Sequence, residues 1–219
     1  ESLAVMNQIM KEKKDEINGL ISNDEPFYIT KMIPTQELYA YELPGQKTKD
    51  IDLLNIPHQA YKYRYKVIVQ NEIEYTFLGK TNAGLRMRFV MTLETAELPF
   101  GETLPKDVMV TTSIDYKGTA KCNQLEWPWT VRLVSNATQS GAINLKIGDI
   151  TFTYQAVTPL ASGDILLLKG VETTLNAFNV NDKTNYEHFI LKPSTTKKIT
   201  VTTNFKGTIQ LLNFVELYK

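Results

Sequence analysis

The chain has 219 residues, with 24 Lys and Arg against 24 Asp and Glu, so its formal charge is zero. Neutrality disfavours nucleic-acid binding through a large basic face, because such binders neutralise many backbone phosphates. Cys122 is the sole cysteine, which excludes an internal disulfide. Only His58 and His188 could join it in a zinc site, which would need all three residues, so we expect no metal and no cofactor.

Apolar runs are short throughout the sequence. A run such as residues 165–168 is far below the about 20 residues that a membrane-spanning helix needs, so we expect no membrane insertion. We find no secretory signal with a charged start and an apolar centre. The chain begins with Glu1 rather than Met, as expected of a processed or truncated product.

Residues 2–21 give the one convincing helical pattern. Ser2 is suited to cap its start, and Pro26 ends the pattern because proline lacks a donor and restricts the residue before it. An isolated helix of this length is marginal in water, so its apolar stripe is expected to pack on a later part of the chain. The stripe consists of Leu3, Met6, Met10, Ile17 and Leu20.

From Phe27 onward the sequence changes to short β-rich segments between turn residues. Tyrosines and cations alternate strictly over residues 61–67. Such a pattern could be a stacking platform for single-stranded nucleic acid. We favour a half-buried strand with the tyrosines on one face and the cations on the other, which the neutral charge supports. The strands expected in this half are residues 27–29, 61–69, 73–78 and 85–93.

Residues 95–107 carry Pro99, Gly101 and Pro105 and predict a linker between domains 1–100 and 108–219. Beyond it no helical period recurs, and Gly148-Asp149 indicates a tight hairpin. The predicted fold class is therefore mainly β: an N-terminal helix packed on a small sheet in an α+β first domain, then an antiparallel β-sandwich. The expected sandwich strands are residues 108–114, 129–135, 142–147, 149–155, 165–169, 172–175, 198–203 and 208–218.

No catalytic set of residues can be assembled from the sequence. Ser140-Gly141 and Ser162-Gly163 lack the strand-turn-helix frame of a hydrolase nucleophile and indicate β-turns. Spacing alone leaves open a Cys122 nucleophile with His58 or His188, but the context of Cys122 favours packing. Neighbouring carboxylates are expected on solvated faces. We therefore expect no enzymatic activity.

Trp127-Pro128-Trp129 has two interpretations. Aromatic faces stack on sugar rings, so Trp127 and Trp129 are the candidate contacts of a non-catalytic carbohydrate-binding module for host-surface recognition. The favoured interpretation is that one indole covers the sandwich core while Pro128 starts an edge strand.

The C-terminal sequence has a distinctive order of segments: a strand, an Asn/Asp-rich turn, an apolar segment ending in Leu191-Lys192-Pro193, and two strands in which Thr and Ile alternate. This order resembles that of siphophage distal tail proteins. Ser194 departs from the glycine that commonly follows the proline. The earlier half shares the family order of a helix, residues 23–28, residues 63–67 and a strand near a proline-containing linker. The matching segments after residue 108 are residues 170–176, 179–193, 198–202, 208–211 and 214–218.

The resemblance implies a structural role in the virion. Such proteins form a hexameric ring at the tail tip that joins the tail tube protein to the baseplate and tail-associated proteins, after assembly in the host cytoplasm. It also implies a ring-forming first domain and a galectin-like second domain. Family members carry further β-strands before the helix, so the ring domain is expected to be incomplete here or completed by residues absent from this sequence. Exposed strand edges of the first domain are the expected contacts in a heterologous ring.

Overall fold

The computed structural model describes residues 3–21, 25–34, 57–81 and 84–219. The chain is mainly β, as predicted, and divides into two compact units, Glu1–Pro99 and Phe100–Lys219. The boundary falls inside the segment 95–107. Residues 100–103 already belong to the second unit, because Thr103 N donates to Glu216 O at 3.0 Å and β6 (Gly101–Glu102) pairs with β19 (Leu217–Tyr218).

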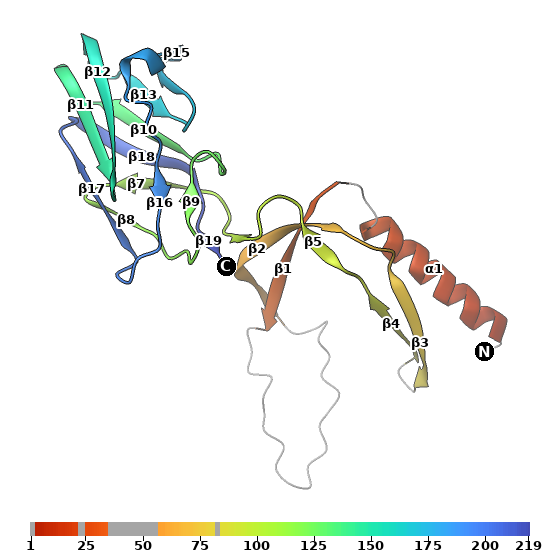
Figure 1. Cartoon of the computed structure of the whole chain (residues 1–219). Helices are drawn as coiled ribbons and strands as arrows, with labels where there is room; N and C mark the ends of the chain where they lie inside the picture. Colours follow the sequence, from red (N-terminus) through yellow and green to blue (C-terminus); the bar gives the residue numbers. More distant parts are fainter. Residues whose placement is uncertain (1–2, 22–24, 35–56, 82–83) are drawn as a thin grey trace, which may run out of the picture. The chain divides into compact units, whose positions relative to one another are not determined.

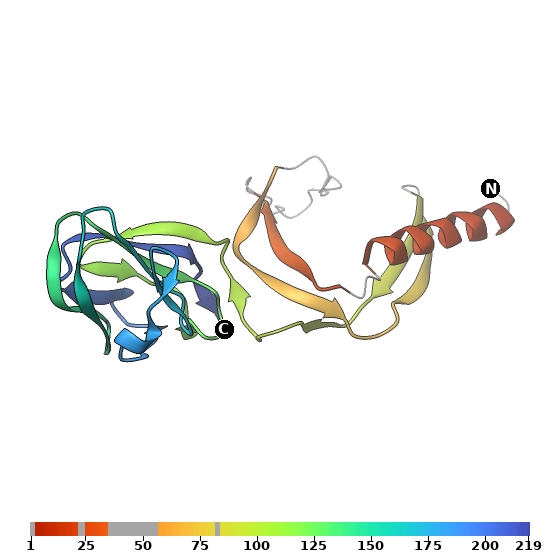
Figure 2. The same cartoon turned by 90° about the horizontal axis from the view of Figure 1, so that it is seen from above.

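Helix α1 (Leu3–Ile21) confirms the predicted helix and lies along the hairpin of β3 (Glu74–Thr81) and β4 (Gly84–Val90) (Figure 1, Figure 2). The Tyr75 hydroxyl on β3 donates to Asn18 Oδ1 at 2.8 Å. The face toward Tyr75 holds Lys14 and Asn18, and Ile17 beside them is half-buried. Leu20, expected in the packed stripe, is instead 75% exposed, because its position in the helical turn points away from this face. Ser2 lies outside the described residues.

A second sheet of the first unit contains β1 (Phe27–Pro34), β2 (His58–Val69) and β5 (Leu93–Thr95), all antiparallel. Phe27 pairs with Val67, and the register shifts between Thr30 and Met32. The predicted strand over residues 85–93 is divided between β4 and β5. The division arises because the chain leaves the hairpin after Val90 and joins the edge of β2 at Leu93.

The second unit is an antiparallel sandwich in which one core cluster contains side chains from both large sheets. The six-stranded sheet has the order β15-β14-β13-β10-β18-β7 and the four-stranded sheet the order β12-β11-β17-β8; β16 pairs with β9 (Figure 1). The bounds are β7 Lys106–Val110, β8 Ser113–Asp115, β9 Cys122–Asn123, β10 Thr130–Ser135, β11 Gln139–Ile147, β12 Ile150–Leu160, β13 Ile165–Leu168, β14 Thr173–Leu175, β15 Phe178–Asn179, η1 Asn181–Lys183, β16 Ile190–Leu191, β17 Lys198–Thr203 and β18 Gly207–Phe214.

The alternation of buried and half-buried side chains along the strands shows which residues face the core. In β10 the residues at alternate positions, Val131, Leu133 and Ser135, are buried while those between them are half-buried. The hairpin prediction at Gly148-Asp149 is confirmed, since Ile147 pairs with Ile150 and Gly148 has φ +59°.

Two predicted strands of the second unit are each divided in two. Residues 108–114 contribute to β7 and β8, which lie in different sheets, and residues 208–218 contribute to β18 and β19. A β-rich stretch of sequence does not reveal the bend at which the chain crosses from one sheet to another. Only the tertiary pairing separates the two halves.

Candidate interaction surface

The residues considered for chemistry are distributed over both units. Cys122 is fully buried in the core of the second unit, and burial raises the pKa of its thiol to about 12. A thiol with so high a pKa stays protonated at neutral pH and is a poor nucleophile. His58 lies on β2 of the first unit, whereas His188 lies half-buried in the second unit. Within the described part of the chain, no three His, Cys, Asp or Glu side chains cluster as a metal site would require.

The two tryptophans occupy different environments. Trp129 is 1% exposed and belongs to the sandwich core, so its ring faces cannot contact a sugar, and Trp127 is half-buried. The expectation that Pro128 starts an edge strand is wrong. Strand β10 begins at Thr130 and is central, pairing with both β13 and β18, and Pro128 precedes the ladder, where its missing donor removes no hydrogen bond.

Burial is distributed unequally between the two units. In the described part of the first unit, only two large apolar side chains, Val67 and Ile73, fall in the buried class. The other apolar side chains that the structure describes as buried lie in the second unit. An isolated domain needs a contiguous apolar core to offset the entropy lost on folding. The described residues of the first unit therefore expose apolar surface that an independent domain would bury.

The exposed apolar side chains of the first unit lie on its helix and on four of its strands. Phe77 and Leu78 are neighbours on β3 and point to opposite faces of the hairpin, as do Phe89 and Val90 on β4. Both hairpin faces thus present apolar groups to solvent. The exposed set is Val5, Ile9, Leu20, Tyr28, Met32, Ile33, Tyr61, Phe77, Leu78, Phe89 and Val90, which we call the first-unit apolar surface.

Tyrosines form a strip on one face of β2, as the alternation predicted. The rings of Tyr61 and Tyr63 lie 4.8 Å apart, and those of Tyr63 and Tyr65 lie 5.6 Å apart, both edge-to-face. The rings pack against each other along the strand, and Tyr61 remains 36% exposed. Such amphipathic rings are typical of protein interfaces.

The cations of β2 are engaged within the first unit. The Arg64 guanidinium lies 3.6 Å from the centroid of the Tyr28 ring, and Lys66 Nζ pairs with Glu97 Oε1. Stacked and paired cations are less available to phosphates than a free basic face. The arrangement agrees with the strand interpretation rather than with a nucleic-acid platform.

Part of this surface could have been predicted from the sequence. Phe77-Leu78 and Phe89-Val90 break strict apolar-polar alternation, which on a two-stranded hairpin leaves an apolar group on each face. The missing information was that β3 and β4 pair only with each other among the described residues.

None of the described helices is long and apolar enough to cross a membrane. No protein-family model matches the chain, and no curated protein matches it significantly in sequence.

Proposed function

We propose that the chain is a structural protein of a phage or prophage tail, forming a ring at the distal tail end that connects the tail tube to the baseplate and tail-associated proteins. Its place would be the tail tip of the virion. The resemblance of the C-terminal segments motivates the tail assignment. The observation that carries the structural role is the first-unit apolar surface, beside which only two apolar side chains are buried among the described residues of that unit.

Assembly would remove that surface from water. Burying apolar area contributes about 25 cal/mol per Å², so a unit with a small core gains much of its stability at an interface. A two-stranded hairpin such as β3–β4 is marginal alone and is stabilised when another surface covers it. In a ring, the surface of one copy meets a different surface on the next, and the rotation between copies sets closure.

The carbohydrate-binding alternative receives no support from the tryptophan pair. Trp129 is enclosed in the core, and the remaining indole of Trp127 is half-buried. We therefore do not propose a sugar site at Trp127 and Trp129.

The test is the mass of the full chain in solution, by light scattering and native mass spectrometry over a concentration range. We expect an oligomer, hexameric if the ring closes as in the family. Leu78 and Val90 are 62% and 41% exposed in the single chain. The double variant Leu78→Lys with Val90→Lys should shift the oligomer toward monomer, because assembly would then bury two lysine charges at the interface.

Val157→Lys is the matched control, since Val157 is a 73% exposed apolar residue of the second unit. It should leave the mass unchanged. A wild-type chain that stays monomeric at high concentration, with a cooperatively folded first unit, would refute the proposal. Equal dissociation in the control and in the hairpin variant would refute the assignment to this surface.

A further inference from the structure

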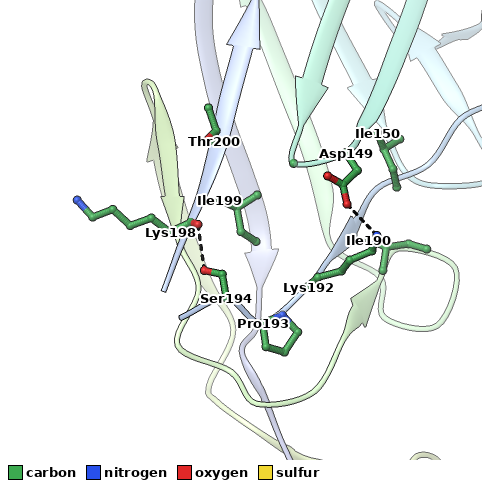
Figure 3. Close-up of a pocket in the computed structure, with 10 residues that line it drawn as sticks. Asp149, Ile150, Ile190, Lys192, Pro193, Ser194, Lys198, Ile199 and Thr200 are labelled. Atoms are coloured by element: carbon green, nitrogen blue, oxygen red, sulfur yellow. Dashed lines mark hydrogen bonds and ion pairs between the residues drawn. The ribbon is translucent and has the colours of Figure 1, made fainter. Parts of the chain in front are cut away.

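A pocket opens in the second unit beside the β11–β12 turn (Figure 3). It lies between Gly148-Asp149 of that turn, the segment that includes β16, and the start of β17. Its volume is about 360 Å³. That size is near the lower end of the range of about 300–1,000 Å³ for small-molecule pockets, so it suits one ring or a chain end.

One side of the pocket is apolar. Ile199 is 8% exposed and Ile150 and Ile190 are half-buried, so their side chains present a carbon surface to the pocket. Gly148 keeps this surface open, because a Cβ at that position would lie 3.3 Å from Ile199 Cγ2. Its φ of +59° is also a conformation that favours glycine.

Two oppositely charged side chains of the pocket lining form an ion pair. Lys192 Nζ lies 2.9 Å from Asp149 Oδ2, and both side chains are at least half exposed. The hydrogen bond and charge of Lys192 lower the pKa of Asp149, which stays ionised at neutral pH. An ammonium has three donors and a carboxylate about four acceptor positions, so most of their hydrogen-bonding capacity is unused by this contact.

The backbone of β17 at the pocket is already bonded. Gly148 N donates to Thr200 O at 2.9 Å, and the Ser194 hydroxyl donates to Lys198 O at 3.1 Å. An added peptide strand would need such acceptors, so β-augmentation is disfavoured here. The Lys198 side chain points away from the pocket (Figure 3). The pocket therefore offers a ligand the isoleucine side chains on one side and the Lys192 ammonium with the Asp149 carboxylate on the other.

We propose that this pocket binds a neutral polyhydroxylated ligand, a sugar ring, with its C–H face on Ile199 and adjacent hydroxyls bonded to Asp149 and Lys192. A hydroxyl both donates and accepts, so neighbouring hydroxyls can satisfy the carboxylate and the ammonium together. A ligand with one net charge would be repelled by the member of the Asp149–Lys192 pair that carries the same charge. A surface ion pair contributes little free energy, so little is lost when its two members form hydrogen bonds to a ligand instead. The inference adds a binding role and does not rest on ring formation.

The experiment is saturation-transfer NMR and calorimetry on the full chain with glucose, galactose, N-acetylglucosamine and rhamnose as separate probes. We expect one of them to bind with millimolar affinity. Asp149→Ala and Lys192→Met should each weaken that binding by about tenfold or more, the loss expected for one ligand hydrogen bond to a charged group. Gly148→Ala should weaken it by narrowing the pocket over Ile199.

Glu172→Ala is the matched control, because Glu172 forms an exposed ion pair of the same 2.9 Å length with Lys169 elsewhere in the second unit. It should bind as the wild type does. The proposal would be overturned if none of the four sugars bound, or if Asp149→Ala left the binding intact. It would also be overturned if inorganic phosphate or a peptide bound more strongly than the sugars. A chain that is monomeric but still binds sugar would support the sugar site while contradicting the ring proposal, so the two proposals can fail separately.

Discussion

Gln124 connects three separated segments of the second unit and offers a sharp test of its packing. The side chain is 4% exposed. Its Nε2 donates to Leu168 O at 3.0 Å and to Trp129 O at 3.2 Å, and its Oε1 accepts from Phe189 N at 2.9 Å. One amide therefore bonds the start of β10, the end of β13 and the segment before β16.

Gln124→Met retains nearly the same shape and removes all three hydrogen bonds. Each bond contributes about 1 kcal/mol net, and each buried group left without a partner costs about 1–3 kcal/mol. The neighbouring carbonyls have a second lone pair and can partly relax, so we expect the free energy of unfolding to fall by about 3–5 kcal/mol.

The assay is denaturant unfolding followed by tryptophan fluorescence. Both tryptophans of the chain, Trp127 and Trp129, lie in the second unit, so their emission reports that unit separately from the first. Gln155→Met is the control, because Gln155 is exposed on β12 and the same substitution there should change stability by less than about 0.5 kcal/mol. A loss below about 1 kcal/mol for Gln124→Met would show that these three hydrogen bonds do not stabilise the second unit.

Three further changes test the second unit. Leu133→Ala should cost about 2–5 kcal/mol in denaturant unfolding, because Leu133 is fully buried on β10, and a value near zero would contradict the placement of the core. Gly207→Ala should destabilise by about 2 kcal/mol or more, since its Cβ would lie 2.1 Å from Val134 O, which requires the paired strands to separate; a wild-type melting temperature would contradict this. Burial also raises the pKa of Cys122 from 9.0 to about 12, so above pH 9 the unfolded chain loses a proton that the folded chain keeps, and stability should fall between pH 9 and 12. Cys122→Ala should lessen that decline without abolishing it, because burial also raises the pKa of Tyr116. Rapid reaction of native Cys122 with a thiol reagent at neutral pH would contradict its burial.

Local patterns predicted the strands well where one face of a strand is buried. The alternation in β10 and the glycine of the β11–β12 turn are properties of a few neighbouring residues, so the sequence contained them. The division of residues 85–93 between β4 and β5 was not contained there, because it depends on which edge the chain meets next. The orientation of Leu20 was missed for a similar reason, since an apolar residue near a helix end fits a stripe whether or not a partner reaches it.

Local sequence patterns and composition were sufficient to predict a mainly β chain with an N-terminal helix and a neutral charge. These follow from periodicity, turn residues and residue inventory, which act over short distances along the chain. Tertiary structure decided which apolar groups were enclosed: Trp129 entered the core, while Leu78 and Val90 stayed exposed. It also joined Asp149 to Lys192 across 43 positions of sequence. Burial and ion pairing depend on contacts between distant segments, and no local pattern specifies those contacts.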